Sequence, residues 1–574
     1  MTTGVRRPAR DTARPHPPRW PSPPVLLALL VGVAAVGWRL ALLLADTPRT
    51  NSDEATMGLA ALHIARGDAF PVFFYGQAYM GTLEAYLAAP LVALTGPSVL
   101  ALRLPLLALY ALLLPLGWRL TRRLGGDRWF ALLVVTVLAL GSDRVVKNQL
   151  IAGGGYPELN PIGLALALLT VHLATGRRAV RDGVRPAPDG TGALPGGRRW
   201  RFAGWGLLAG LTVWVDPLLL PYLLALGVVL VGATGRELRG RAGFLLAGGL
   251  LLGAAPLLGH SVGPGRSPVA AALAASGGDA AAGWADRLSG GLLLGPSLGM
   301  GLCGPGGCAP WQLWWSVALP VLLALAGWSA WRTLRPGAGD PQPSDPGGPA
   351  RAGAAVRLAL VAGAVGTLLA YTVSSAAGRT PVESSRYLSC LAVSLPALLW
   401  PLWRAARDTA PRAARVDAPD GGAPGRAGVD SGAPRQRVGR VAAVGVLAAL
   451  VGTAVVATAG TVGTVPGNRA EAQRHRTLVD ALRARDVRHV YGEYWTCNRL
   501  TFAAREEIVC AVLDDRLRPG FDRVPAYRRA VAGATDPGYV APVGSPLAAR
   551  LDRSPPPGYA PVTVSGWRIW LAGH

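Results

Sequence analysis

Residues 51–103, NSDEATMGLAALHIARGDAFPVFFYGQAYMGTLEAYLAAPLVALTGPSVLALR, decide the fold of this chain. They follow the first long apolar run, residues 24–45, so they emerge at a membrane surface. Two adjacent acids, Asp53 and Glu54, lie near the start, and an aromatic run with glycines, PVFFYGQAYMG, lies in the middle. As a helix, residues 83–94 would be about 18 Å long, too short for a bilayer core of about 30 Å. The stretch therefore predicts a polar loop held at the membrane surface by short helices.

The composition of the whole chain is typical of a multi-pass membrane protein. Of its 574 residues, 51% are hydrophobic and 16% are charged, and apolar runs of about 18 to 22 residues recur along it. The net charge of +24 comes from arginines that cluster in short links between these runs, as in cytoplasmic loops. No zinc-finger spacing or aromatic-interleaved basic patch accompanies the arginines, so nucleic acid is not an expected partner.

The apolar runs and basic links predict an all-α bundle of about eleven transmembrane helices. Residues 1–21, rich in Arg and Pro, are expected to be a disordered cytoplasmic tail, and residues 22–463 the transmembrane domain, with a first outer loop at 46–97. Residues 464–574 alternate helical and strand-like patterns, which predicts a small extracytoplasmic α/β domain without a catalytic constellation. We expect a multi-pass protein of the plasma membrane with a cytoplasmic N-terminus and an extracytoplasmic C-terminus.

The five cysteines are too few for a disulfide framework. The spacing of Cys303 with Cys308 and of Cys497 with Cys510 could give two pairs, both on the outer side, where disulfides persist. Cys390 is left within a membrane segment. The seven histidines have no metal-ligand spacing, so no dedicated metal site is predicted, although two adjacent acids could hold Mg²⁺ or Mn²⁺.

Asp53 and Glu54 are the first candidates for chemistry. Asn51 and Glu54 have the spacing of a capping box, and acids favour the first turn of a helix, so a structural role is the simpler reading. The alternative depends on their place in an outer loop, beside an aromatic segment and a helix at the membrane surface. A carboxylate there can accept a proton from an acceptor hydroxyl as a general base.

The acidic pair and the segments ALHIARGD, FFYGQAYMG and ALRLP that follow it resemble the GT-C-fold glycosyltransferases, which include protein O-mannosyltransferases and aminoarabinose transferases. The likeness covers residues 51–105 and continues more weakly to about residue 404, and YGEYWTCNRLTF in the tail resembles the outer domain of bacterial members. The resemblance implies a polyprenyl-phosphate-linked sugar donor, an extracytoplasmic glycan, protein or lipid acceptor, Asp53 as base and Glu54 as an orienting group. The chain has YMGTLEA where aminoarabinose transferases carry Glu-Lys-Pro-Pro, which leaves the sugar open.

A donor phosphate also needs cations at the outer surface. Arg103, Arg386 and Lys147, the only lysine of the chain, are the candidates, and an arginine fork suits a phosphate well. For the two arginines the alternative is snorkelling at the interface, and for Lys147 it is a solvated charge in an outer loop at residues 142–160. Arg144 is a fourth available cation, for which a solvated charge in a loop is the simpler reading.

Six further residues could line a substrate groove, since aromatic, amide and carboxyl groups suit sugars. They are Tyr75, Gln77, Tyr79, Glu84, Glu158 and Asp216. The tyrosines and the glutamine could instead belong to an interfacial belt, and Asp216-Pro217 could simply end a helix between two spans.

Two other functional classes are open. A transporter or flippase of a lipid-linked substrate would carry internal repeats and polar groups at mid-membrane, and we find no repeat. A non-catalytic membrane assembly protein, with the outer domain as its working part, is the second alternative.

Overall fold

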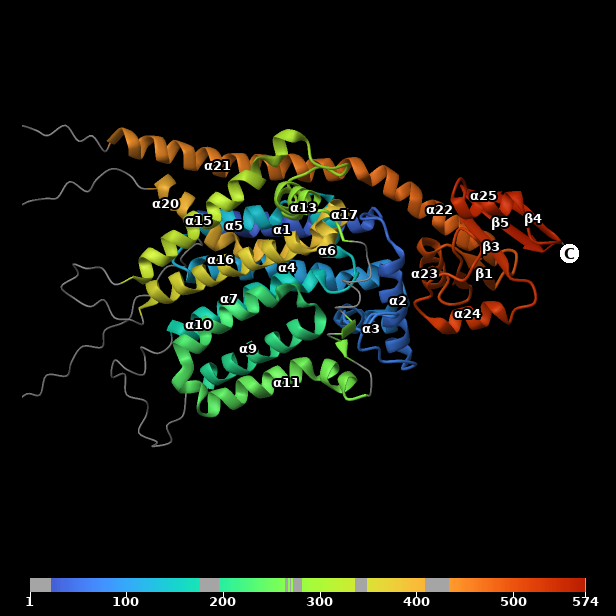
Figure 1. Cartoon of the computed structure of the whole chain (residues 1–574), viewed down its shortest axis with the longest axis horizontal. Helices are drawn as coiled ribbons and strands as arrows, with labels where there is room; N and C mark the ends of the chain where they lie inside the picture. Colours follow the sequence, from blue (N-terminus) through green and yellow to red (C-terminus); the bar gives the residue numbers. More distant parts are fainter. Residues whose placement is uncertain are drawn as a thin grey trace, which may run out of the picture.

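The computed structural model of the chain describes residues 22–175, 196–263, 267–268, 270–271, 281–335, 348–407 and 433–572. The predicted tail at 1–21 lies outside the described residues. A helical bundle forms one part of an elongated molecule, and a small α/β domain lies beyond one of its ends, with two short helices between them (Figure 1). We call the end of the bundle that faces the α/β domain the domain end.

The bundle consists of long apolar helices. They are α1 (Pro23–Leu44), α4 (Val99–Arg123), α5 (Arg128–Ala139), α7 (Tyr156–Thr175), α9 (Gly196–Val215), α10 (Leu220–Leu238), α11 (Arg241–Ser261), α15 (Trp314–Leu334), α16 (Pro349–Val373) and α21 (Ala433–Gly460). Among the described residues, nine helical runs are long and apolar enough to cross a membrane, or ten if α5 and α6 (Asp143–Leu150), bent by 88°, form one span. With α9, which lies beside α11 in the bundle, the arrangement agrees with the predicted helical membrane domain.

The predicted outer loop at 142–160 is wrong in part. Residues 143–150 form α6, with Asp143 in its first turn and the buried Val146 and Leu150 on one face, and α7 begins already at Tyr156. Only residues 151–155 between the two helices are irregular. The short amphipathic pattern escapes notice in the sequence because a polar helix of eight residues resembles a loop.

Short helical segments complete the bundle. They are η1 (Pro217–Leu219), α13 (Trp284–Leu288), η2 (Ser289–Leu294), α14 (Gly295–Gly299), η3 (Pro310–Leu313), α17 (Ser375–Arg379), α18 (Pro381–Ser384), η4 (Ser385–Ser394), α19 (Leu395–Leu398) and α20 (Trp400–Arg407). The span that runs from α18 to α20 is thus a 3₁₀ helix flanked by short α-helices. Its prolines Pro381, Pro396 and Pro401 lie in the first turns of α18, α19 and α20, where a missing N–H costs least.

Glycines allow α9 and α11 to pack with their backbones in contact. Gly206 and Gly210 on α9 face Gly249 and Gly253 on α11. A Cβ atom at any of the four would lie 2.0 to 2.2 Å from a carbonyl oxygen of the opposite helix, closer than any real contact. Each pair has the G-x-x-x-G spacing that brings helices together inside membranes.

The loop after α1 forms two helices at the domain end, α2 (Ser52–Arg66) and α3 (Leu83–Thr95). Asn51 caps α2, because its side chain accepts a hydrogen bond of 2.8 Å from the Glu54 N–H. Gly67 ends the helix in the left-handed conformation, with φ 77°. The predicted capping role of Asn51 and the two short helices are therefore present.

The last bundle helix leads directly into the C-terminal domain. α21 continues through η5 (Thr461–Thr464) into α22 (Val465–Arg483), and the domain adds the helices α23 (Tyr494–Ala503), α24 (Pro525–Ala532) and α25 (Pro546–Arg553). The strands are β1 (His489–Gly492), β2 (Val509–Val512), β3 (Gly538–Pro542), β4 (Tyr559–Val564) and β5 (Trp567–Ala572).

The sheet has the order β2-β1-β3-β5-β4. β1 is parallel to both of its neighbours, whereas β5 is antiparallel to β3 and β4. The buried face of this sheet includes Val490, Val540 and Ile569, which form a core with α22 and α23. The predicted small α/β domain is confirmed.

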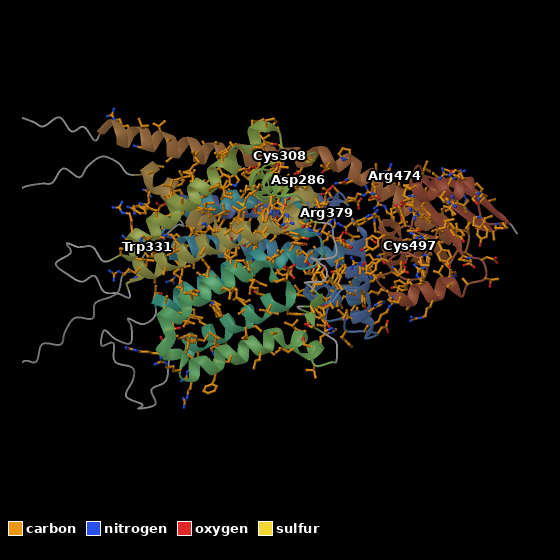
Figure 2. The ribbon with its side chains drawn as sticks, in the orientation of Figure 1. Asp286, Cys308, Trp331, Arg379, Arg474 and Cys497 are labelled. Carbon is orange, nitrogen blue, oxygen red and sulfur yellow. A yellow bond between two sulfur atoms is a disulfide. The ribbon has the colours of Figure 1, made fainter. Side chains whose placement is uncertain are left out.

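Two disulfides lie toward the domain end. Cys303 bonds to Cys308 in the loop after α14, and Cys497 on α23 bonds to Cys510 on β2. Figure 2 labels Cys308 at the bundle and Cys497 in the C-terminal domain, both far from Trp331 at the opposite end. Cys390 is free and buried in η4.

Candidate active site

A cavity of about 680 Å³ opens where the bundle, the first loop and the C-terminal domain meet. Its lining comes from all three parts of the chain. The lining residues are Arg49, Thr50, Asn51, Asp53, Arg144, Lys147, Asn148, Ile151, Gly153, Tyr156, Val382, Glu383, Ser385, Arg386, Trp495 and Arg499. Three of the predicted site residues, Asp53, Lys147 and Arg386, therefore share one cavity.

Cations dominate the wall of this cavity. Five of its lining side chains are basic and two, Asp53 and Glu383, are acidic. Arg499 is already paired with Glu471, at 2.8 and 3.1 Å. Among the described residues, neither Lys147 nor Arg386 forms an ion pair, and both side chains are exposed. Unpaired cations in a cavity attract an anion.

Arg386 is held by aromatic rings rather than by acids. Its guanidinium carbon lies 5.2 Å from the ring centre of Tyr156 and 5.6 Å from that of Tyr387. Such cation–π contacts, together with a hydrogen bond to the Tyr387 side chain, orient the guanidinium without an acidic partner among the described residues.

Asp53 lies in the first turn of α2, and its side chain is 26% exposed. Its Oδ1 accepts a hydrogen bond of 2.6 Å from the hydroxyl of Tyr494 and one of 3.1 Å from Nη2 of Arg523. Within the described part of the chain, no group donates to Oδ2. The carboxylate thus has one oxygen fixed and one oxygen free beside the cavity.

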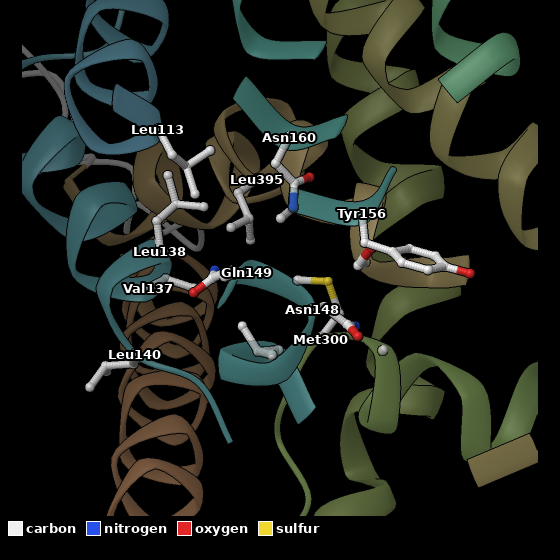
Figure 3. Close-up of a pocket in the computed structure, with 14 residues that line it drawn as sticks. Leu113, Val137, Leu138, Leu140, Asn148, Gln149, Tyr156, Asn160, Met300 and Leu395 are labelled. Carbon is white, nitrogen blue, oxygen red and sulfur yellow. The ribbon is translucent and has the colours of Figure 1, made fainter. Parts of the chain in front are cut away.

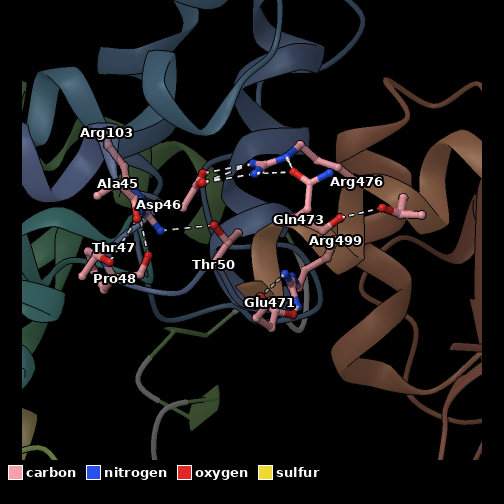
Figure 4. A network of polar contacts seen from close by, with 11 residues as sticks. Ala45, Asp46, Thr47, Pro48, Thr50, Arg103, Glu471, Gln473, Arg476 and Arg499 are labelled. Carbon is pink, nitrogen blue, oxygen red and sulfur yellow. Dashed lines mark hydrogen bonds and ion pairs between the residues drawn. The ribbon is translucent and has the colours of Figure 1, made fainter. Parts of the chain in front are cut away.

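Glu54 and Arg103 are engaged with each other. Both Glu54 oxygens accept hydrogen bonds of 2.6 Å from Nε and Nη2 of Arg103, and the side chains are 0% and 2% exposed. Arg103 also donates to the Pro48 carbonyl at 2.8 Å and to the Thr50 hydroxyl, in the network of Figure 4. Neither residue lines the cavity, so the structure does not place Arg103, a predicted phosphate contact, or Glu54, predicted to orient the acceptor or the base, at its wall. We assign this pair a structural role.

The aromatic loop between α2 and α3 is packed against the bundle and does not line the cavity. Tyr75 donates or accepts a hydrogen bond of 2.7 Å with His63, and burial with nearby Glu506 raises the pKa of its hydroxyl to about 12. The Gln77 backbone N–H closes a turn onto the Phe74 carbonyl, whereas its buried side-chain oxygen has no partner among the residues that the structure describes. Tyr79 is half-buried.

The three acidic groove candidates lie together behind the cavity wall. Glu84 accepts hydrogen bonds of 3.1 Å from the N–H groups of both Gly154 and Gly155, which have φ angles of 106° and 94°. Glu158 lies beside Glu84 and Asp216, and all three are buried. α9 ends at Val215, and Asp216 caps the start of η1 by accepting a hydrogen bond from the Leu218 N–H. Glu84 thus holds the loop that contains Gly154 and Gly155, next to the cavity, in its conformation.

A second cavity of about 40 Å³ lies next to the first, and Asn148 and Tyr156 line both. It has room for about three water molecules at about 10–15 Å³ each. Figure 3 shows Gln149 and Asn160 pointing into it among apolar side chains. Gln149 in turn accepts a hydrogen bond of 2.8 Å from the buried Arg39 of α1.

Several residues of the site were not predicted from the sequence. Tyr494, Trp495 and Arg499 on α23, and Arg523 before α24, belong to the C-terminal domain, for which no catalytic constellation was expected. The domain reaches Asp53 through contacts across more than 400 positions in the chain, and local patterns carry no signal for such contacts.

Among the described residues, no three His, Cys, Asp or Glu side chains are grouped in a way that could hold a metal ion.

The site and the fold together define a class: a multi-pass membrane protein of the GT-C fold, with a charged cavity between its bundle and its C-terminal domain. The crystal structure of ArnT from Cupriavidus metallidurans bound to undecaprenyl phosphate is similar over 96% of this chain and 98% of that one, with a TM-score of 0.53 and 14% identity. Its apo structure matches over 96% and 99%, with a TM-score of 0.50.

No family model matches the sequence, and no curated protein matches it. At 14% identity the likeness to ArnT establishes the fold and nothing finer. The predicted resemblance to GT-C-fold glycosyltransferases is confirmed at that level.

Proposed function

We propose that this protein transfers a sugar from a polyprenyl-phosphate carrier to a hydroxyl acceptor outside the cytoplasm, at the cavity that Asp53, Lys147 and Arg386 line. The ArnT structure that shares the fold was solved with undecaprenyl phosphate, which supports a polyprenyl phosphate as carrier. The identity of the sugar and the choice among glycan, protein and lipid acceptors are left to experiment. The basic links between the apolar runs support an orientation with the cavity outside.

The proposal rests on one observation: two cations and a carboxylate line the same cavity. Within the described ranges of the chain, Lys147 and Arg386 are exposed cations without acidic partners, and Asp53 presents a carboxylate oxygen that no group donates to. A phosphate leaving group needs cations, and an attacking hydroxyl needs a base, so the cavity holds both requirements of the reaction.

In the proposed reaction, the acceptor oxygen bonds to the anomeric carbon of the sugar. The bond from that carbon to the phosphate oxygen breaks, and the lipid phosphate leaves with the electron pair. Oδ2 of Asp53 takes the hydroxyl proton. Lys147 and Arg386 stabilise the charge that develops on the phosphate, in a place where Arg386 is already oriented by Tyr156 and Tyr387.

The test is sugar transfer in liposomes that contain the purified chain, polyprenyl-phosphate sugars labelled with tritium and a crude envelope acceptor fraction. Asp53→Asn keeps the size of the side chain and removes the base. We expect the variant to lose transfer by about 100-fold or more, within the range for a general base.

Asp46→Asn is the matched control. Asp46 lies in the same loop and forms an exposed ion pair with Arg476, so its loss should leave transfer within about twofold of the wild type. Equal transfer by Asp53→Asn and the wild type would remove the base from the proposal. A wild type inactive with every donor would remove the enzyme itself.

A further inference from the structure

We infer that the C-terminal domain completes the active site, with Arg523 and Tyr494 acting as positioning residues that hold Asp53. The inference rests on the proposed function and adds two residues to it. It assigns to the domain a part in the reaction beyond covering the membrane domain.

Arg523 and Tyr494 form a closed triangle with Asp53. Nε of Arg523 donates to the Tyr494 hydroxyl at 2.8 Å, the hydroxyl donates to Oδ1 of Asp53 at 2.6 Å, and Nη2 of Arg523 donates to the same oxygen at 3.1 Å. Both contacts to Asp53 reach one oxygen. The triangle therefore fixes the rotation of the carboxylate and leaves Oδ2 for a proton from the acceptor.

The guanidinium of Arg523 is itself locked in place. Its carbon lies 4.6 Å from the ring centre of Phe74, 5.2 Å from that of Phe521 and 5.6 Å from that of Tyr494. Nη1 donates to the Tyr75 carbonyl at 3.2 Å, and the residue is 8% exposed. An arginine enclosed in this way loses little further freedom when it orients a carboxylate.

Tyr494 remains a hydrogen-bond donor under working conditions. Burial and the neighbouring Asp53 carboxylate raise the pKa of its hydroxyl well above the usual value of 10.0. The hydroxyl therefore keeps its proton and donates it to Oδ1. The next residue, Trp495, lines the cavity and is 57% exposed, so α23 also provides part of the wall.

Contacts between α23 and α2 fix the position of Tyr494 relative to Asp53. The Ser52 hydroxyl donates to the Tyr494 carbonyl at 2.6 Å and accepts from Asn498 at 2.9 Å. Further along α2, the Phe502 ring lies directly on Gly58, where a Cβ atom would be 2.6 Å from it. Asp53 is thus fixed relative to the C-terminal domain by contacts on both sides of it.

The experiment measures kcat and the donor KM of the full chain in liposomes for Tyr494→Phe, Arg523→Gln and Arg523→Lys. A hydrogen bond to a charged group contributes about 1.5–3 kcal/mol, so we expect kcat to fall about 10- to 100-fold in the first two variants. The donor KM should change by less than about twofold, because the phosphate contacts are intact. Arg523→Lys should recover part of kcat.

Arg568→Gln is the control within the same domain, since Arg568 pairs with Asp552 at the surface and touches nothing at the cavity. Combining Arg523→Gln with Asp53→Asn separates positioning from general damage. If Arg523 acts through Asp53, the double variant transfers no more slowly than Asp53→Asn alone.

Three outcomes would overturn the inference. The first is an unchanged kcat in Arg523→Gln and Tyr494→Phe while Asp53→Asn is inactive. The second is a rise in donor KM as large as the fall in kcat. The third is a double variant whose loss of kcat is the sum of the losses of the single variants. The first of these would leave the proposed function in place. A wild type without transfer would instead remove the proposed function, and the positioning role with it.

Discussion

Asp53 and Glu54 are neighbours in the sequence, and the structure predicts opposite results from neutralising them. Glu54→Gln would leave the Arg103 guanidinium buried without a counter-charge, because both side chains are almost completely enclosed. Two unit charges about 4 Å apart attract by about 4 kcal/mol at an effective dielectric constant of about 20. Measured losses on breaking buried pairs are about 3–5 kcal/mol, which agrees with that figure.

The assay is thermal unfolding of the purified protein in detergent, followed for the wild type and each variant. At about 2 °C per kcal/mol, the lower end of the range for large domains, Glu54→Gln should lower the Tm by about 6–10 °C. Asp53→Asn should change the Tm far less, because Asp53 is partly exposed and keeps its neighbours through the amide oxygen. Its loss should appear in transfer instead.

The double variant Glu54→Gln with Arg103→Met tests the reasoning directly. Removing both charges takes away the uncompensated guanidinium, so the Tm should recover part of the loss. If Glu54→Gln alone were within about 1 °C of the wild type, the pair would not be the structural element that its burial indicates. If the double variant were less stable than the sum of both single variants, the account by unpaired charge would be wrong.

Four further predictions follow from other contacts. Lys147→Gln should raise the donor KM by about tenfold with a smaller effect on kcat, measured in the transfer assay, since it removes one cation from the cavity. Burial alone would raise the pKa of Glu506, but hydrogen bonds from His63 and Tyr527 lower it to about 2. The contribution of Glu506 to domain docking is therefore present above about pH 4.5 and is lost as the pH falls toward 2. Limited proteolysis across that range should detect release of the domain in the wild type, but no such pH effect in a Glu506→Gln variant. Breaking the bond between α23 and β2 by Cys497→Ser should lower the Tm of the C-terminal domain by calorimetry, and an unchanged Tm would contradict a stabilising role. Gly210→Leu should prevent α9 from meeting α11 and reduce the yield of folded protein by size-exclusion chromatography, whereas Gly232→Leu, with open space around its Cβ position, should not.

The fold was largely predictable because its signals are local. Apolar runs of membrane length, the Asn51 cap and the alternating pattern of the tail each depend on residues near one another in the chain. The failures also have physical reasons. α6 is short and polar, and the 3₁₀ span of η4 differs from an α-helix in hydrogen-bond pattern rather than in composition.

The site was predictable only in part. Charged residues next to apolar runs can be recognised in the sequence, and three of those predicted, Asp53, Lys147 and Arg386, share one cavity. Arg103 fits the same pattern, yet it pairs with Glu54, and nothing in a linear sequence tells a free arginine from a paired one. Arg523 and Tyr494 lie more than 400 residues from Asp53, and only the packing of two domains brings them together.

The cavity contains the only lysine of the chain, and this gives the protein a built-in reporter. All of its other side-chain cations are arginines or histidines, so a reagent that acylates side-chain amines has a single target, Lys147. Its mass adduct can be read on one peptide after digestion. Protection of that peptide by increasing amounts of a lipid phosphate would then measure occupancy of the cavity directly, before any sugar or acceptor has been identified.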